Sequence, residues 1–191
     1  MPKDYLNQPV TAVRRSDRAI TDDQWIVRFL ADAPTGVFAY VHNNQPFVNT
    51  NLFVYAPARH AIYFHTANVG RTPAVIGLNG RYICFTAFNM GRLLPAAEAL
   101  EFSVEYASVV AYGTARIVTD PAEAKEGLQA LLDKYAPHLQ PDKDYRGITP
   151  DELKRTAVYK LTIDEWVGKR KAVATDFPGA YYFDDVHHTN R

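Results

Sequence analysis

Strand-like segments in this sequence follow one another across short turns and do not alternate regularly with helices. Three of them lie close together, at 36–41, 45–55 and 61–66, and the turns at 43–44 and 56–59 join them. Connections this short place strands side by side and antiparallel, because a parallel crossover needs about a dozen residues or more. We therefore expect a three-strand meander within an antiparallel barrel whose gaps and end are filled by helices, rather than a doubly wound sheet.

The rest of the chain continues this pattern. Gly113 interrupts a long extended segment and predicts a bulge or a close backbone approach, as barrel corners need. Capping residues ahead of apolar stripes predict the helices. The expected strands cover 82–88, 101–119 and 156–163, the helices 21–32, 73–78, 120–135 and a short one from 149, and the loops 89–99, 138–148 and 164–171.

Composition fits a single domain over residues 1–191, with an irregular N-terminal arm at 1–20 and a C-terminal tail at 172–191. The 21 basic residues balance 21 acidic ones, which argues against nucleic acid as a partner. The single cysteine, Cys84, can form no internal disulfide, and no apolar run is long enough for a membrane span or a signal peptide. We expect a cytoplasmic protein that binds neither membranes nor nucleic acid.

The stretch 59–73 carries the strongest chemical signal. It predicts a strand that His65 closes, a loop, and then Arg71 beside Thr72 and Pro73, which are a good N-cap and a good first helical residue. A guanidinium beside a helix N-terminus suits a phosphate, since backbone N–H groups and the helix dipole act together with it. The alternatives are a capped helix with a solvated arginine, and a histidine that is only structural.

Two amides on the second expected strand indicate a polar binding partner for that strand face. Asn49 and Asn51 share a face with Phe47 and Phe53, and asparagine disfavours strands.

Motifs for other ligands are missing: no G-x-G-x-x-G follows a strand, and neither a P-loop nor a G-x-S-x-G elbow occurs. Aspartates and histidines gather at 184–188, but such a mixed polar tail predicts no metal site.

Four segments carry a resemblance to a known family. They are IYFHTANVGR at 62–71, YASVVAYGTARIV at 106–118, DELKRTAVYKLTIDEWVGK at 151–169 and, more weakly, FVNTNLFVY at 47–55. Together they resemble the FMN-binding split-barrel family related to pyridoxamine 5'-phosphate oxidase. The set looks most like the nitroimidazole-resistance (5-nitroimidazole reductase-like) branch.

This resemblance implies a mainly β fold, a six-stranded antiparallel split β-barrel with peripheral helices, and a homodimer with two FMN sites at the subunit interface. In the family, one strand lies along the flavin ring, and the ribityl phosphate reaches a strand end and the next helix. A neighbouring strand and a Trp/Thr-x-Gly-Lys loop complete the site. The resemblance carries these roles to Asn49, Thr50 and Asn51 (ring), His65, Thr66, Arg71 and Thr72 (phosphate end), Ser108 and Val109 (neighbouring strand), and Trp166 and Lys169 (loop).

Two departures bear on function. The C-terminal arginine and histidine motif of true pyridoxamine phosphate oxidases is missing, so vitamin B6 oxidation is not expected. In the nitroimidazole-resistance branch, the histidine that matches His65 is implicated in activity, and bound flavin is not assured. His65 is therefore the candidate catalytic residue. For Trp166, packing in the core or an interface is an equal alternative to a lid over the flavin.

The sequence thus supports an FMN-dependent oxidoreductase that reduces a small planar substrate such as a nitroaromatic, with His65 delivering a proton. An alternative from another class is a flavin-binding carrier, store or redox sensor without turnover, which suits the missing nicotinamide motif. A third is a haem-handling split barrel, although none of the six histidines lies in a haem motif. FAD, F420 and an empty site stay open beside FMN, and so do the substrate and the electron donor.

Overall fold

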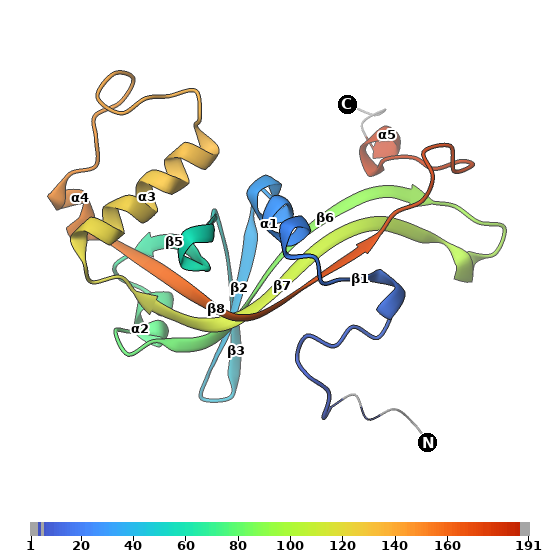
Figure 1. Ribbon diagram of the computed structural model, residues 1–191, viewed down its shortest axis with the longest axis horizontal. Helices are drawn as coiled ribbons and strands as arrows, with labels where there is room; N and C mark the ends of the chain where they lie inside the picture. The colour runs from blue at the N-terminus through green and yellow to red at the C-terminus, as the bar shows by residue number, and fades with distance from the viewer. Residues whose placement is uncertain (1–3, 5, 188–191) are drawn as a thin grey trace.

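One antiparallel sheet organises the computed structural model, which describes residue 4 and residues 6–187 (Figure 1). Among these residues the sheet has eight strands, in the order β3-β2-β6-β7-β8-β5-β4, with β1 paired to β8. The mainly β, antiparallel fold expected from the sequence is confirmed, with eight strands among the described residues in place of the six that the resemblance implied. The strands are β1 (Ala19–Ile20), β2 (Gly36–His42), β3 (Gln45–Asn51), β4 (Val54–Ala56), β5 (Ala61–Ala67), β6 (Arg81–Leu94), β7 (Ser103–Ile117) and β8 (Thr156–Lys171).

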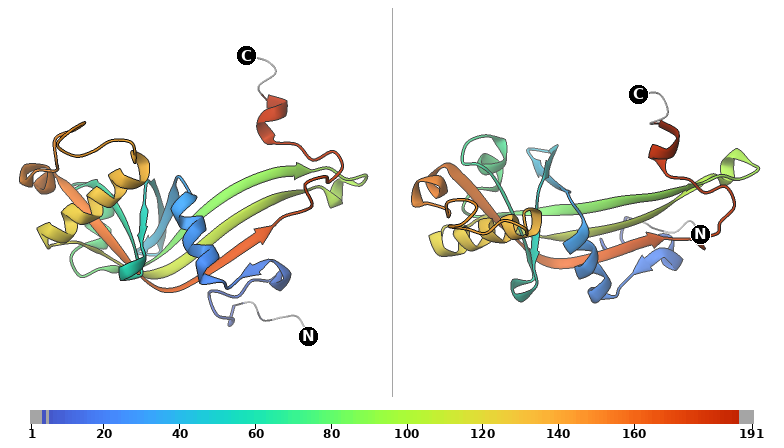
Figure 2. Two further views of the ribbon diagram at one scale, coloured as in Figure 1. Left: turned by 45° about the horizontal axis from the view of Figure 1, so that its top comes forward. Right: turned by 90° about the horizontal axis from the view of Figure 1, so that it is seen from above.

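Short helices accompany the sheet. α3 (Pro121–Tyr135) and α4 (Pro150–Arg155) lie together at one end, and α5 (Phe183–His187) lies near the other end (Figures 1 and 2). α1 (Asp23–Asp32) leads into β2, and α2 (Arg71–Ile76) connects β5 to β6. No helix in the described part of the chain is long and apolar enough to cross a membrane.

The predicted strand at 45–55 breaks into β3 and β4, and the expected meander is wrong at this point. β3 pairs with β2, whereas β4 pairs with β5 at the opposite end of the strand order. Phe53 explains the break, because its ring is fully buried and its N–H donates to the hydroxyl of Tyr135 at 3.0 Å instead of to a strand. Since β3 and β4 are this close in sequence, the two sheet edges lie near each other and the sheet curls into a split barrel.

Three strands run on past the barrel as a long extension, formed by residues 88–94 of β6, 103–112 of β7 and 164–171 of β8 (Figure 2). The sequence predicted loops for most of the β6 and β8 parts, and this was wrong. Pairing stabilises these segments, because β7 lies between the other two and β1 adds to β8. Their strand character comes from these neighbours more than from intrinsic propensity.

Gly113 makes the predicted close backbone approach, beside a bulge whose extra residue is Asp164 on β8. The register between β7 and β8 shifts between Tyr112 and Gly113. A Cβ atom on Gly113 would lie 1.9 Å from the carbonyl oxygen of Thr162, so only glycine fits where the two backbones approach. The bulge lies where β8 leaves the barrel and enters the extension, and bulges bend and twist strands in this way.

The predicted helix starts are confirmed for the two later helices and corrected for the first. The carboxylate of Asp120 accepts the N–H of Ala122 at the start of α3, and Thr149 with Glu152 forms the capping box of α4. α1 is capped by Asp22, one residue later than expected, because its carboxylate accepts the N–H of Gln24 at 2.9 Å.

Aromatic rings fill the barrel core. The ring of Phe64, on β5, stacks on Phe38 with 3.8 Å between centroids and on Tyr159 with 4.6 Å, and all three are fully buried. The neighbouring Tyr63 belongs to a second cluster with Ala124 of α3. Successive residues of β5 therefore face either the barrel interior or α3, as the alternation of its sequence predicted.

Candidate functional site

The start of α2 meets β3 in a polar group that we name the α2 cluster (Asn49, Arg71 and Thr72). Thr72 is buried, and its hydroxyl lies 3.0 Å from the hydroxyl of Tyr40 and accepts the amide N–H of Asn49 at 3.1 Å. The guanidinium of Arg71 lies over the ring of Phe47, 4.4 Å from its centroid. Among the described residues, no carboxylate is within ion-pair distance of Arg71, so its charge is available to an anion.

Thr72 is not the N-cap of α2, which begins two residues earlier than the predicted helix at 73–78. Its hydroxyl is engaged with Tyr40 and Asn49 and cannot also cap the helix. Gly70 holds the cap position with a φ of 120°, a conformation that glycine adopts readily. Because Gly70 has no side chain, the first N–H groups of α2 keep their capacity to bind an acceptor.

β3 presents the predicted amides on its inward face. Phe47, Asn49 and Asn51 are half-buried, whereas Val48 and Thr50 between them are exposed. The side-chain nitrogen of Asn51 is buried and has no hydrogen-bond partner in the described structure. A buried amide donor without a partner is unfavourable, so the position fits a ligand that brings a hydrogen-bond acceptor. A flavin, whose ring carries carbonyl oxygens, meets this requirement.

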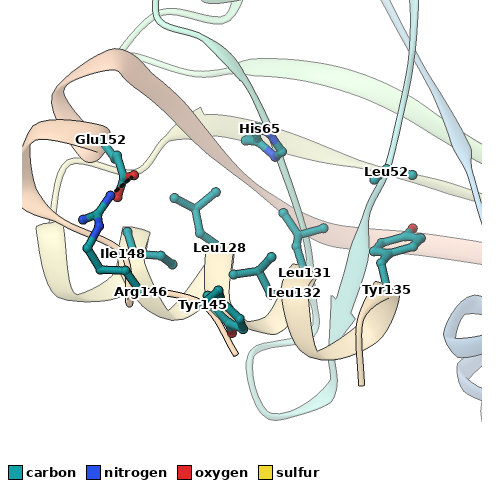
Figure 3. Close-up of a pocket in the computed structure, with 10 residues that line it drawn as sticks. All are labelled: Leu52, His65, Leu128, Leu131, Leu132, Tyr135, Tyr145, Arg146, Ile148 and Glu152. Carbon is teal, nitrogen blue, oxygen red and sulfur yellow. Dashed lines mark hydrogen bonds and ion pairs between the residues drawn. The ribbon is translucent and has the colours of Figure 1, made fainter. Parts of the chain in front are cut away.

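A separate cavity of about 340 Å³ lies between β5 and α3, and we name it the His65 cavity (Figure 3). Leucines of α3 form much of its wall. An ion pair of 2.8 Å between Arg146 and Glu152 lies at one side of the cavity, opposite Tyr135. The lining residues are Leu52, His65, Leu128, Leu131, Leu132, Tyr135, Tyr145, Arg146, Ile148 and Glu152.

His65 reaches this cavity from the helix-facing side of β5. Its side chain is exposed at the mouth of the cavity and makes no hydrogen bond to any described residue, and partial desolvation lowers its pKa from the ordinary 6.5. Thr66 turns the other way, with its hydroxyl donating to the carbonyl of Ala67 at 2.7 Å and 3.1 Å from the hydroxyl of Tyr159. No described contact joins His65 to Arg71 or Thr72, so the histidine and the α2 cluster are distinct sites within one chain.

Sequence reasoning identified His65 but missed the cavity around it. The apolar stripe of the helix at 120–135 predicted core packing, and the segment 138–148 predicted only a loop. The fold brings both over β5, where they form the cavity wall. The sequence held no local signal for this, because the walls come from segments far apart in the chain.

The remaining predicted residues lie on β7 and β8. Ser108 pairs with Lys169 across these strands, and the ammonium of Lys169 lies 5.3 Å from the ring centroid of Tyr106. Val109 is fully buried in the core. The contacts of the described residues do not join this group to the α2 cluster. Within one chain, the two parts of the predicted flavin site are separate.

Trp166 and Lys169 belong to β8 and not to a loop, which corrects the expected closing segment. Trp166 is held in place: its indole N–H donates to the carboxylate of Asp23 at 2.8 Å, and its ring lies 5.4 Å from that of Tyr55 and 4.6 Å from that of His60. These contacts fit the packing role that was the alternative for this residue.

The acidic tail forms no metal cluster in the part of the chain that the structure describes. No group of three or more histidine, cysteine, aspartate or glutamate side chains occurs there with a geometry that could hold a metal ion. Asp184 and Asp185 belong to α5, and His188 lies outside the described residues.

The described structure is thus a split antiparallel barrel with a polar cluster at one helix start and a separate cavity beside His65. Residues 22–170 match the family described as pyridoxamine 5'-phosphate oxidase. The chain belongs to this family, which confirms the broader resemblance found in the sequence. No curated protein matches the chain.

Several solved structures share the fold. The FAD and heme binding protein of Mycobacterium smegmatis is 21% identical, with a TM-score of 0.73 over 82% of this chain and 74% of that one. The flavocytochrome Anf3 of Azotobacter vinelandii is 23% identical, with a TM-score of 0.74 over 96% and 81%. A protein of Bacteroides thetaiotaomicron assigned to 5-nitroimidazole antibiotic resistance is 19% identical, with a TM-score of 0.65 over 80% and 86%. At these identities the likeness shows the fold alone.

Proposed function

We propose that this protein binds a flavin and uses it to reduce a small planar substrate such as a nitroaromatic. The observation that carries the proposal is the buried amide of Asn51, which lacks a partner on the same strand face as the α2 cluster. Two relatives of the same fold are named for flavin, as an FAD and heme binding protein and a flavocytochrome, which supports this assignment.

The residues present fit a flavin from its ring to its phosphate. Asn51 would donate to the ring, with Asn49 and Thr50 beside it on β3. Arg71 would hold the phosphate together with the free N–H groups at the start of α2, beside Thr66 and Thr72. The flavin itself would supply the electrons for reduction, and the protein would bind and orient it. One arginine matches one phosphate group, which favours FMN, although the relative named as an FAD and heme binding protein leaves FAD as the direct competitor.

The proposed role of His65 is to deliver a proton to the substrate, and because His65 and the α2 cluster are distinct sites within one chain, this role requires that the flavin ring reach the His65 side in the assembled protein. Proton delivery needs the charged imidazole, and partial desolvation lowers the pKa of His65. We therefore expect turnover to rise as the pH falls toward and below about 6.5, the ordinary pKa of histidine. A His65→Gln variant should lose this pH dependence. If wild type and H65Q share one pH profile, His65 is not the proton donor.

We further propose that two copies of the chain form the flavin site. Asn49 and Arg71 in the barrel and Ser108 and Lys169 on the extension are predicted to face one flavin, yet no described contact joins the two groups. A homodimer, in which the extension of one copy reaches the barrel of the other, would bring them together.

The first experiment is the visible absorption spectrum of the purified protein, followed by release and identification of the bound molecule. A flavin spectrum with FMN released would support the proposal, and Arg71→Ala should then lose the cofactor. Arg28→Ala, an exposed arginine on α1, is the matched control and should keep it. A colourless protein that takes up neither FMN nor FAD would overturn the flavin assignment.

The alternative of a flavin carrier, store or redox sensor predicts a bound flavin without turnover. The purified holoprotein would be mixed with NADH or NADPH and a nitroaromatic acceptor under anaerobic conditions. Consumption of both substrates in a fixed ratio, abolished in Arg71→Ala, supports the oxidoreductase. A flavin that chemical reductants reduce, but that never passes electrons to an acceptor, supports the carrier.

A second candidate function is electron transfer through haem as well as flavin. The specific observation in its favour is His65, an imidazole without a hydrogen-bond partner at an apolar cavity. The two relatives named for heme or as a flavocytochrome make this combination known for the fold. It assigns His65 to iron binding in place of proton delivery, so the two roles are separated by experiment.

A further inference from the structure

We propose that a gap between β2 and β6 binds a small, flat aromatic molecule that carries a carboxylate or a phosphate, with Arg81 as the residue that binds the anion. The gap has a volume of about 720 Å³, which lies in the size range of small-molecule sites. We name it the β2–β6 gap (39–41, 43, 44, 46–48, 81–84 and 112, with Val10 at its edge). It is a second site beside the proposed flavin site and does not require a bound flavin.

The gap exists because two neighbouring strands separate. β2 pairs with β6 at only three positions, and the pairing ends at Ala39 and Cys84. Both strands continue past this point, β2 to His42 and β6 back to Arg81, while the hairpin of β2 and β3 turns away from β6 (Figure 1). The facing strand edges therefore have no ladder partner there among the described residues, and their backbone N–H and C=O groups are available to a ligand.

Arg81 gives the gap its charge preference. Among the described residues that line the gap, no other side chain is charged. The Nε atom of Arg81 is buried without a hydrogen-bond partner, and no carboxylate in the described part of the chain lies within ion-pair distance of its guanidinium. A buried N–H without an acceptor is unfavourable. A carboxylate or a phosphate would supply both the acceptor and the opposite charge, and its oxygens match the planar guanidinium.

Aromatic rings form much of the wall, which favours a flat ligand. Tyr40 and Phe47 are held in place, because their ring centroids lie 6.0 Å apart and the hydroxyl of Tyr40 lies 3.0 Å from that of Thr72. Tyr82 is 54% exposed, so its ring can turn over a bound molecule, and Tyr112 lines the gap from β7. Ring faces of this kind stack on aromatic ligands. An aromatic wall with one unpaired cation fits an aromatic anion better than it fits a cation or a metal ion.

The β2–β6 gap adjoins the α2 cluster but uses different residues. Phe47 lines the gap, whereas Arg71 lies over the same ring, 4.4 Å from its centroid, and does not line the gap. Asn51, whose unpaired amide supports the flavin proposal, does not line it either. Loss of the Arg81 guanidinium should therefore leave flavin binding unchanged, so the two sites can be separated by experiment.

The test is isothermal titration calorimetry of the full-length protein with naphthoate and with naphthylmethanol, which has the same ring without the charge. Wild type should bind one naphthoate per chain, at least tenfold more tightly than the alcohol. Arg81→Leu should remove this preference, and Arg81→Lys should restore part of it. Arg155→Leu, an exposed arginine at the end of α4, is the matched control and should behave as wild type.

A second pair of probes, AMP and adenosine, identifies the source of the anion. A larger preference for naphthoate over its alcohol supports the site as one for an aromatic carboxylate. A larger preference for AMP over adenosine supports it as one for a nucleoside phosphate.

Two variants show whether binding occurs in the gap. Val41→Trp adds a large ring at the gap from a position that is 51% exposed, so the fold should survive while both anions are excluded. R81L should unfold at the same temperature as wild type or higher, because no protein hydrogen bond is lost. A large drop in that temperature would show that the guanidinium has a structural partner, and would overturn the proposal. It is also overturned if neither anion binds, or if both bind wild type, R81L and V41W equally.

Flavin is measured in the same samples from the visible spectrum. R81L that loses naphthoate but keeps flavin supports the gap and leaves the flavin proposal intact. A protein that binds naphthoate through Arg81 but takes up no flavin keeps the gap site and overturns only the flavin proposal. Loss of flavin in R81L would make the gap part of the flavin site, and would overturn its assignment to a second ligand.

Discussion

At the scale of single residues, Asn51 has a chemistry that the folded chain leaves unsatisfied. Its amide nitrogen is buried and unpartnered, and such a donor costs about 1–3 kcal/mol in the folded state. Folded proteins keep unfavourable polar groups of this kind mainly where a ligand compensates them. The unpaired amide of Asn51 therefore lowers the stability of the cofactor-free protein, and it raises the affinity for a ligand that accepts its hydrogen bond.

Replacing Asn51 by Leu should separate these effects. Thermal unfolding of the cofactor-free protein should occur at the same temperature or higher, because no protein hydrogen bond is lost. The dissociation constant for flavin, measured by fluorescence quenching, should rise about 5- to 20-fold, which corresponds to about 1–2 kcal/mol. Val48→Thr, on the exposed face of the same strand, is the control. A large loss of stability in N51L would show that the amide has a structural partner.

Lys134 is a second residue whose environment sets a measurable property. Its ammonium donates to the carbonyls of Leu30 at 3.0 Å and Ala33 at 2.8 Å, and lies 3.8 Å from the ring centroid of Phe53. These contacts close the end of α1 against α3. Burial nevertheless dominates and lowers the pKa of Lys134 to about 8.

This pKa predicts a stability that rises with pH. Because the folded-state pKa lies below the ordinary 10.5, the unfolded chain binds more protons between about pH 8 and 10.5. The free energy of unfolding should therefore increase across this window, relative to Lys134→Met, by about 1–2 kcal/mol after allowance for solvent screening. Urea unfolding of both proteins at pH 7.5 and 10.5 measures the difference. A difference that stays constant would contradict the lowered pKa.

At the scale of elements, the structure depends on how β8 crosses from barrel to extension. A bulge at Asp164, beside Gly113 of β7, makes this possible, because the register of β8 on β7 shifts there while both parts of β8 stay in one sheet. The close approach to Thr162 leaves no room for a side chain. Strand geometry at this one position thus determines the direction of the whole extension.

Gly113→Ala should therefore be strongly destabilising. The added methyl group would overlap the carbonyl of Thr162, and relief requires the backbone to shift and ladder hydrogen bonds to weaken. We expect a loss of about 2–4 kcal/mol in the free energy of unfolding, measured with urea. Gly147→Ala, in the loop before α4, meets only the flexible carboxylate of Asp142 at 3.3 Å and should change it by less than about 1 kcal/mol. Equal effects of both variants would refute the steric argument.

The elements also show how far the sequence could be interpreted. Capping residues such as Asp120 and Thr149 predicted α3 and α4 correctly, because a helix start is a local chemical event. The extension in β6 and β8 was missed, because pairing with β7 stabilises polar segments that have no strong strand pattern. The break at Phe53 was also missed, since its cause is the hydroxyl of Tyr135, far away in the sequence.

In the candidate site, too, local features were predicted from the sequence, whereas features that depend on tertiary structure were not. Residues 49, 51, 65 and 71 were predicted from their types and spacing, and the inward face of β3 is as expected. The pairing of Thr72 with Tyr40, and the walls around His65, depend on segments that only the fold brings together. A single sequence names chemical groups, whereas their neighbours across the sheet come from tertiary structure.

At the scale of the whole molecule, the extension stands apart, because the α2 cluster and the His65 cavity both lie in the barrel part of the chain. It carries Phe88 at 58% and Met90 at 46% exposure on β6, and Phe102 at 55% exposure directly before β7. Large apolar side chains gathered on a projecting surface mark an interaction site. A second copy is the partner that this argument favours, because the predicted flavin residues Ser108 and Lys169 lie on the same strands.

Phe88→Glu tests this assembly and its link to the cofactor. The side chain is exposed in one chain, so the substitution should leave the unfolding temperature of the monomer nearly unchanged. It should convert a dimer to a monomer in light scattering after gel filtration, and it should weaken flavin binding at least tenfold, because the half of the site on the extension is lost. Leu139→Glu, 41% exposed in the loop between α3 and α4, carries the same charge change away from the extension and should keep both dimer and flavin. A wild-type protein that is monomeric and binds flavin fully would refute the shared site, and a dimer that F88E leaves intact would place the interface elsewhere.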